Sequence, residues 1–231
     1  MITASQKDII SLVKTLRTKG YQVFDRPYEL NIVGIRKNDV NANNFDDGIF
    51  VFWKDDSGNW VGDYNPATTD PGTYWLKNPM NVDGTAILKE GQYINAYRIG
   101  KHKGQYDALV QVKPVTVIRD YDRNAVLDFN NGKETTGLYG INIHRSALSG
   151  KSQNVDKWSA GCQVFQIGSD FEDFMKRADK HRKLYGNTFT YTLIDERAYS
   201  RNVKRRGIYV VLGVALALAL FSYRRYIKLN K

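Results

Sequence analysis

The sequence is poor in the residues that most often carry out chemistry in proteins. Its 231 residues include one cysteine, Cys162, and three histidines, His102, His144 and His181. A single cysteine excludes an intramolecular disulfide, so the thiol is free and the redox compartment is not fixed. The cysteine and the scattered histidines have no spacing typical of a metal site, so we expect no bound metal and no cofactor. Candidate chemistry therefore centres on one thiol and three imidazoles.

Acidic residues are absent from the C-terminal tail. Of the 34 basic residues, nine lie between Arg197 and Lys231, where there is no Asp or Glu. This leaves 25 basic against 24 acidic residues in positions 1–196. The net charge of +10 thus belongs mainly to the tail, and the body lacks the broad basic surface of a nucleic-acid-binding protein. We expect no nucleic-acid partner.

The tail contains an uncharged, mainly apolar run of 17 residues, Gly207–Tyr223, with arginines at both ends. This length is at the lower limit for crossing a bilayer, and tyrosine and arginine suit the two interfaces. A buried core helix is the alternative, but the flanking arginines have no acidic partners. We predict a single membrane-spanning anchor in the lipid bilayer. Its orientation is open because both ends are basic.

The body is predicted to be mainly β with flanking helices (α+β), folded as a sandwich or barrel. Short runs rich in branched and aromatic residues alternate with Gly and Asp turns, which is typical of antiparallel strands. Ser5 and Asp8 resemble a capping box before a helix that ends at Gly20. A second helix is predicted over Phe171–Tyr185, capped by Ser169 or Asp170. The predicted strands are 30–35, 49–53, 60–61, 74–76, 85–88, 93–97, 108–112, 115–118 and 188–194.

The predicted organisation has five parts. They are an amphipathic helix packed on the core (1–20), a β-rich catalytic domain (21–198), a basic linker (199–206), a transmembrane anchor (207–226) and a basic tail (227–231). The residues from Met1 to Lys7 do not resemble a cleavable secretory leader, because a basic start followed by an apolar run is missing.

The single thiol lies in the run Ser159-Ala160-Gly161-Cys162, 18 positions after His144. An imidazole can take the thiol proton and generate an attacking thiolate. Gly161 lets the backbone approach a substrate, and N–H groups there can hold an oxyanion. Ser159 can orient the imidazole through its hydroxyl or its carbonyl. A small buried cysteine with only a packing role is the alternative.

The other two histidines are weaker candidates for a base. His102 is expected in a loop between strands, where it can line a cleft. His181 lies in the charged segment 176–183 and is expected on the solvated face of a helix.

The histidine and the Ser-x-Gly-Cys run together resemble the L,D-transpeptidase (YkuD) family. The turn before Tyr74, Thr69-Asp70-Pro71-Gly72, is also similar to a Pro-Gly segment of that family. The sequence departs from the family pattern at Arg145, where a glycine usually follows the histidine, at Ala160, and at Gln163-Val164. The N-terminal extension and the basic anchor are more similar to a phage or mobile-element version.

The resemblance implies a β-rich fold in which Cys162 attacks a carbonyl of a peptidoglycan stem peptide. His144 would be the general base, Ser159 a supporting residue, and Gly161 and Arg145 would contact the substrate or the oxyanion. The acyl group would then pass to an amine (transpeptidation) or to water (hydrolysis). For such an enzyme we expect the thiol to be alkylated well below pH 8.5.

Two alternatives are open. A catalytically inactive protein of the same fold could bind the cell wall or serve as a virion membrane protein. An intracellular cysteine protease is the third possibility, since no leader is visible.

Overall fold

The structure is a computed structural model of the chain, and it describes residues 1–130 and 132–199. The predicted anchor at 207–226 and the basic segments beside it, from residue 200 onward, lie outside the described residues. Within the described ranges, no helix is long and apolar enough to cross a membrane.

The described residues include twelve strands and three complete helices, and a further helical stretch begins at residue 196. The helices are α1 (Gln6–Thr18), α2 (Thr73–Lys77) and α3 (Gly168–Tyr185). The strands are β1 (Ile2–Thr3), β2 (Asn31–Arg36), β3 (Asp47–Lys54), β4 (Trp60–Thr68), β5 (Thr85–Leu88), β6 (Gly91–His102), β7 (Tyr106–Gln111), β8 (Val115–Asp120), β9 (Glu134–Gly137), β10 (Ile143–Arg145), β11 (Gln163–Phe165) and β12 (Phe189–Asp195).

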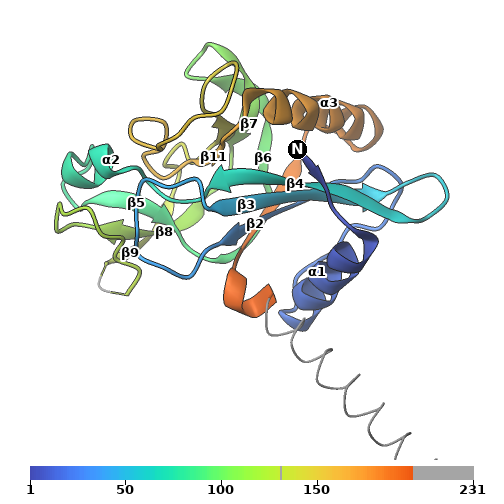
Figure 1. The fold of residues 1–231 in the computed structure, drawn as a ribbon, viewed down its shortest axis with the longest axis horizontal. Helices are drawn as coiled ribbons and strands as arrows, with labels where there is room; N and C mark the ends of the chain where they lie inside the picture. The colour runs from blue at the N-terminus through green and yellow to red at the C-terminus, as the bar shows by residue number, and fades with distance from the viewer. Residues whose placement is uncertain (131, 200–231) are drawn as a thin grey trace, which may run out of the picture.

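The larger of the two sheets closes on itself. Its strand order is β1-β4-β11-β10-β7-β6-β12-β2-β3, and β3 also pairs along its length with β4. Eight strands therefore form a barrel, with β1 added at the outer edge of β4. A second sheet, β5-β8-β9, lies beside the barrel (Figure 1). The mainly β architecture with a few helices confirms the predicted fold class.

Alternation along the strands divides the apolar side chains between two cores. Successive side chains of a strand point to opposite faces. Ile32 and Val51 therefore face the larger core, whereas their neighbours Val33 and Phe52 pack against α1. The larger core also receives side chains from α3 and from the small sheet. Figure 1 shows α1 and α3 on opposite sides of β2, β3 and β4.

The predicted N-terminal helix is confirmed, and Ser5 caps it. The Ser5 hydroxyl accepts a hydrogen bond from the Asp8 N–H at 3.2 Å. Ile9, Leu12 and Leu16 form the buried stripe and are at most 1% exposed. Burying such side chains stabilises a fold by about 1.5–3 kcal/mol each, so this helix is part of the core.

Two predictions of local structure are wrong. The segment predicted as strand 74–76 is the helix α2, because the turn at Gly72 places its carbonyl to accept from the N–H groups of Trp75 and Leu76 at 3.0 and 3.2 Å. Leu76 is then buried, so tertiary contacts override the strand preference of the aromatic residues. The helix α3 begins at Gly168 rather than Phe171, and neither Ser169 nor Asp170 caps it.

His181 is buried, not solvated. Its exposed fraction is 5%, and its Nδ1 accepts a hydrogen bond from the Leu30 N–H at 3.1 Å. Its Nε2 lies 3.2 Å from the Thr188 carbonyl, which can only accept, so Nε2 donates. Burial lowers the pKa of this imidazole. Both nitrogens are thus used to join α3 to the barrel, and His181 has no role as a base.

Candidate active site

Parallel pairing of β10 with β11 brings the two halves of the predicted site together. His144 lies opposite Val164, so Cys162 stands two positions before the partner of His144. The pairing extends one residue upstream, since the Gln163 N–H donates to the Asn142 carbonyl at 2.9 Å. Residues two apart along an extended chain share a face. The thiol and the imidazole therefore lie on the same side of the sheet, as diagonal neighbours.

The imidazole of His144 is held in one orientation. Its Nδ1 lies 2.7 Å from the carbonyl oxygen of Arg145, and that carbonyl also accepts from the Tyr106 hydroxyl at 3.3 Å. A carbonyl can only accept, so Nδ1 carries the ring proton. The other nitrogen, Nε2, is buried and has no hydrogen-bond partner among the described residues. Its lone pair is the free basic position of the ring.

The environment of His144 keeps it neutral. Burial lowers its pKa to about 3, and the neighbouring imidazole of His102 adds to this shift. The residue is 2% exposed. A neutral imidazole is the form that can accept a proton, so at neutral pH His144 is in the state that a general base requires.

His102 is part of the site, which the sequence did not reveal. It ends β6 rather than lying in a loop, and its ring stacks on that of His144 with 4.0 Å between the centroids. The side-chain oxygen of Asn142 accepts a hydrogen bond from the Gln111 N–H at 3.0 Å. The side-chain nitrogen therefore faces His102 and donates to its Nδ1 at 3.0 Å. Burial lowers the pKa of His102 to about 4. Two neutral rings therefore lie side by side.

The thiol of Cys162 is partly exposed and is held by the backbone. Its Sγ donates to the Gly140 carbonyl at 3.4 Å and accepts from the Asn142 N–H at 3.4 Å. Neither imidazole is hydrogen-bonded to it in the described part of the chain. Burial raises the pKa of the thiol, and the Asn142 N–H opposes this only in part. The resting pair is thus a protonated thiol beside a neutral imidazole.

Ser159 shapes the loop before the thiol instead of orienting the imidazole. Its hydroxyl donates to the Cys162 carbonyl at 2.8 Å and accepts from the Gly161 N–H at 3.1 Å. Its own carbonyl accepts from the Gly72 N–H at 2.9 Å. Because the Gly161 N–H is already engaged, the Cys162 N–H is the donor available for an oxyanion. It has no partner among the residues that the structure describes.

Gly161 is required by the shape of this loop. Its φ of +119° lies in a region that other residues rarely adopt. A Cβ at this position would lie 2.3 Å from the Ala86 carbonyl oxygen, which is backbone and cannot move aside easily. The loop that precedes Cys162 therefore packs closely against β5, and the glycine permits that close approach.

A cavity of about 200 Å³ lies beside this loop. Trp75, Tyr139 and Ala160 contribute to its walls, together with the guanidinium of Arg119. The Arg119 guanidinium lies 4.6 Å from the centre of the Tyr139 ring and donates to the Gly84 carbonyl at 3.3 Å. Within the described ranges Arg119 forms no ion pair. A cation without a carboxylate partner in a cavity wall can receive an anionic group of a ligand.

Arg145 does not reach the oxyanion region. Its guanidinium lies over the ring of Tyr106, 4.2 Å from the centroid, and lines a separate cavity of about 580 Å³ between β7 and α3. Asp107, Glu172 and Asp179 also line that cavity. The structure therefore places the Arg145 guanidinium in a different cavity from the thiol, whereas its backbone carbonyl holds the imidazole of His144.

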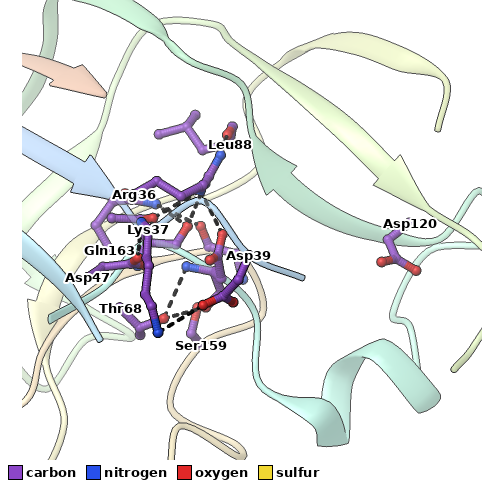
Figure 2. A network of polar contacts seen from close by, with 12 residues as sticks. Arg36, Lys37, Asp39, Asp47, Thr68, Leu88, Asp120, Ser159 and Gln163 are labelled. Carbon is purple, nitrogen blue, oxygen red and sulfur yellow. Dashed lines mark hydrogen bonds and ion pairs between the residues drawn. The ribbon is translucent and has the colours of Figure 1, made fainter. Parts of the chain in front are cut away.

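Gln163, the residue after the thiol, is fixed by a buried polar network (Figure 2). Its amide nitrogen donates to the Thr69 carbonyl at 3.3 Å, and its oxygen accepts from the Tyr191 hydroxyl at 2.7 Å. Asp47 accepts from the Thr69 N–H at 2.7 Å. Burial and the negative charge of Asp70 raise the pKa of Asp47 to about 7. The network ties β11 to β3, β4 and β12 just below the thiol.

No family model, curated protein or solved structure matches the chain. The functional assignment therefore rests on the residues of this chain. The structure brings Cys162, His144, Ser159 and Gly161 together, and it adds His102 and Arg119.

Proposed function

We propose that the protein is a membrane-anchored cysteine acyl-transfer enzyme of the L,D-transpeptidase type that acts on peptidoglycan stem peptides. The observation that carries this proposal is the state of His144. Its Nδ1 is fixed on the Arg145 carbonyl, while Nε2 is buried and unpartnered on the face that also presents Cys162. A base with one nitrogen held and the other free is the arrangement that nucleophile activation requires.

The first half of the reaction forms a thioester. As Sγ of Cys162 attacks the peptide carbonyl carbon, the thiol proton passes to Nε2 of His144. The carbonyl oxygen becomes an oxyanion, which the Cys162 N–H can stabilise. The C–N bond then breaks, and the leaving amine takes the proton back from His144.

The second half returns the enzyme to its starting state. An acceptor amine or a water molecule gives a proton to Nε2 of His144 and attacks the thioester carbon. The C–S bond breaks, and the proton returns to the departing sulfur. An amine acceptor gives a new peptide bond, whereas water gives a carboxylate.

The cavity beside the thiol supports a substrate that carries a carboxylate. Arg119 lines this cavity without an acidic partner in the described chain, and Trp75 and Tyr139 offer apolar surface next to it. Stem peptides carry free carboxylates, so an arginine here can fix the substrate relative to Cys162 through a charge-assisted hydrogen bond.

A second candidate is a protein of the same fold that binds wall peptides without turning them over. The protonated thiol, hydrogen-bonded to the Gly140 carbonyl rather than to an imidazole, favours this alternative. In the enzyme, the substrate would displace that contact. In the binding protein, the contact would persist and the cavity alone would be used.

Purified muropeptides distinguish the two candidates. The full chain in detergent is incubated with them beside Cys162→Ala and His144→Ala, and products and adducts are read by mass spectrometry. The enzyme gives new cross-linked or shortened peptides and an acyl adduct on Cys162, both of which are lost in the two variants. Equal product formation by Cys162→Ala would refute the enzyme. Binding without products, equally by wild type and Cys162→Ala, would establish the second candidate.

The anchor is tested separately. We propose that residues 207–226 hold the protein in the bilayer. The full chain should stay in the membrane pellet after alkaline extraction, and a chain ending at residue 199 should be released. Release of the full chain would contradict the anchor.

A further inference from the structure

Three carboxylates meet where β8 ends. Asp120 is the last residue of β8, and Asp122 and Asp128 lie in the connection toward β9. One carboxylate oxygen of each lies within 4.8 Å of those of the other two. None of the three forms an ion pair with any residue in the described ranges. Their negative charges are therefore uncompensated within the described chain.

The carboxylate of Asp120 is buried and only half satisfied. The residue is 0% exposed. Its Oδ2 accepts from the Asp128 N–H at 3.0 Å, but its Oδ1 has no partner among the described residues. A buried oxygen without a partner is costly, because it has lost its hydration without gaining a replacement. Figure 2 shows Asp120 well apart from the polar network that includes Arg36, Lys37 and Asp47.

The spacing of the oxygen-bearing side chains points to a particular ligand. Asp120, Asp122, Asn124 and Asp128 occupy positions 1, 3, 5 and 9 of a run, which are side-chain positions of a calcium-binding loop. This loop departs from that pattern in having Ala125 at the sixth position, where glycine is usual. It also joins two strands instead of two helices.

The loop is held in place without a ligand. Leu127 is buried, and its N–H donates to the Val40 carbonyl at 3.0 Å. The N–H of Asn124 donates to Asp122 Oδ1 at 3.1 Å. The three carboxylates are therefore kept close together by the fold despite their mutual repulsion.

We propose that Asp120, Asp122 and Asp128 bind a divalent cation, and that the cation is Ca²⁺. The side-chain oxygen of Asn124 accepts from the Val126 N–H at 2.5 Å, so Asn124 helps to hold the loop and is not counted as a ligand. All three ligand groups are hard oxygen donors, which do not select zinc or copper. Ca²⁺ accepts six to eight oxygens in irregular geometry, whereas Mg²⁺ demands a near-ideal octahedron. The histidine and cysteine spacing of the chain gives no sign of this site, because its ligands are carboxylate oxygens. The proposal is independent of the acyl-transfer function.

Calorimetry on the full chain in detergent tests the site. After treatment with a chelator, titration with CaCl₂ should show one saturable site, and the midpoint of thermal unfolding should rise with calcium concentration. Titration with MgCl₂ should give at least tenfold weaker binding. Asp122→Asn and Asp128→Asn should each weaken calcium binding at least tenfold. Asp25→Asn, at an exposed carboxylate elsewhere on the surface, should bind as the wild type does.

Asp120→Asn tests whether loss of calcium binding comes from the missing ligand and not from loss of the fold. This variant removes a buried charge, so in chelator it should unfold at the wild-type temperature or higher, yet it should lose the calcium response. The proposal is overturned if millimolar calcium neither binds nor shifts unfolding, or if these variants bind calcium as tightly as the wild type. Equal affinity for Mg²⁺ would overturn the assignment to calcium.

Discussion

The ionisation of Cys162 gives the sharpest test of the active-site geometry. Burial raises the thiol pKa, and His144 is neutral with its pKa lowered to about 3, so the resting site holds no thiolate–imidazolium pair. An ordinary cysteine with a pKa of about 8.5 is roughly 3% thiolate at pH 7. We expect Cys162 to have less thiolate than that. The rate of alkylation by iodoacetamide should therefore rise with a midpoint above about pH 8.5. This reverses the expectation from the sequence alone.

Replacing His144 separates ionisation from catalysis. In His144→Ala the alkylation midpoint should move little, because the imidazole is uncharged and makes no hydrogen bond with the resting thiol. Turnover of muropeptides should fall by about 10²–10⁴, since a general base contributes that much. At 1.36 kcal/mol per tenfold, the loss corresponds to about 3–5 kcal/mol of transition-state stabilisation.

Removing a buried ring can also loosen the fold, so His144→Gln and near-UV circular dichroism serve as controls. Both variants should show the same alkylation midpoint if they keep the native spectrum. A wild-type midpoint well below pH 8.5 that rises in both variants would show a resting ion pair. That result would refute the assignment of a neutral pair.

Three further predictions concern residues around the thiol. Gly161→Ala should lower the free energy of unfolding in urea by about 2–3 kcal/mol, because of a strained φ together with a backbone clash. Gly140 is the matched control: its φ is +71° and an added Cβ would have no atom within 4 Å, so Gly140→Ala should cost only about 1 kcal/mol. Equal losses in the two variants would contradict the clash. Asp47 has a folded pKa of about 7, above its unfolded value, so it stabilises the fold at low pH and this stabilisation is lost as pH rises toward 7. Asp47→Asn should flatten the decline of unfolding free energy between about pH 4 and 7, and an unchanged slope would contradict it. Arg119→Met should raise KM about 10- to 100-fold for substrates with a carboxylate but not for their amides; an equal rise for both would exclude carboxylate recognition.

Local patterns in the sequence predicted most of the secondary structure. The stripe of Ile9, Leu12 and Leu16 fixes α1, and alternation identifies most of the strands. The strand predicted at Tyr74–Leu76 is wrong because its aromatic residues favour a strand in isolation, while the burial of Leu76 decides for a helix. The short strands β1, β9 and β11 were not predicted. The sequence did not decide between a sandwich and a barrel. The barrel depends on the pairing of β11 with β4, which joins residues almost 100 positions apart.

Cys162 and His144 of the candidate site were predicted from the sequence, but the part played by His102 was not. The histidine and the Ser-x-Gly-Cys run were singled out in the sequence, and the pairing of β10 with β11 brings them to one face of the sheet. His102 reaches His144 only because β6 ends there, and no local pattern shows this. For His181 the signal was present: it continues the spacing of Phe174 and Ala178 on the buried face of α3, yet its charged neighbours suggested solvent. Asp120 is similar, since its spacing to Asp122 is readable but its burial is not.

The two sites proposed here share one strand. Successive residues of β8 point to opposite faces, so Arg119 faces the cavity beside the thiol while Asp120 faces the carboxylate cluster. The Arg119 guanidinium is held by the Gly84 carbonyl, and Gly84 in turn packs against the backbone of Asp120. A cation bound to Asp120 would fix the end of β8 and, through Gly84, the position of the guanidinium. Calcium would therefore act on the cavity by limiting the movement of the Arg119 guanidinium, without contact with the substrate.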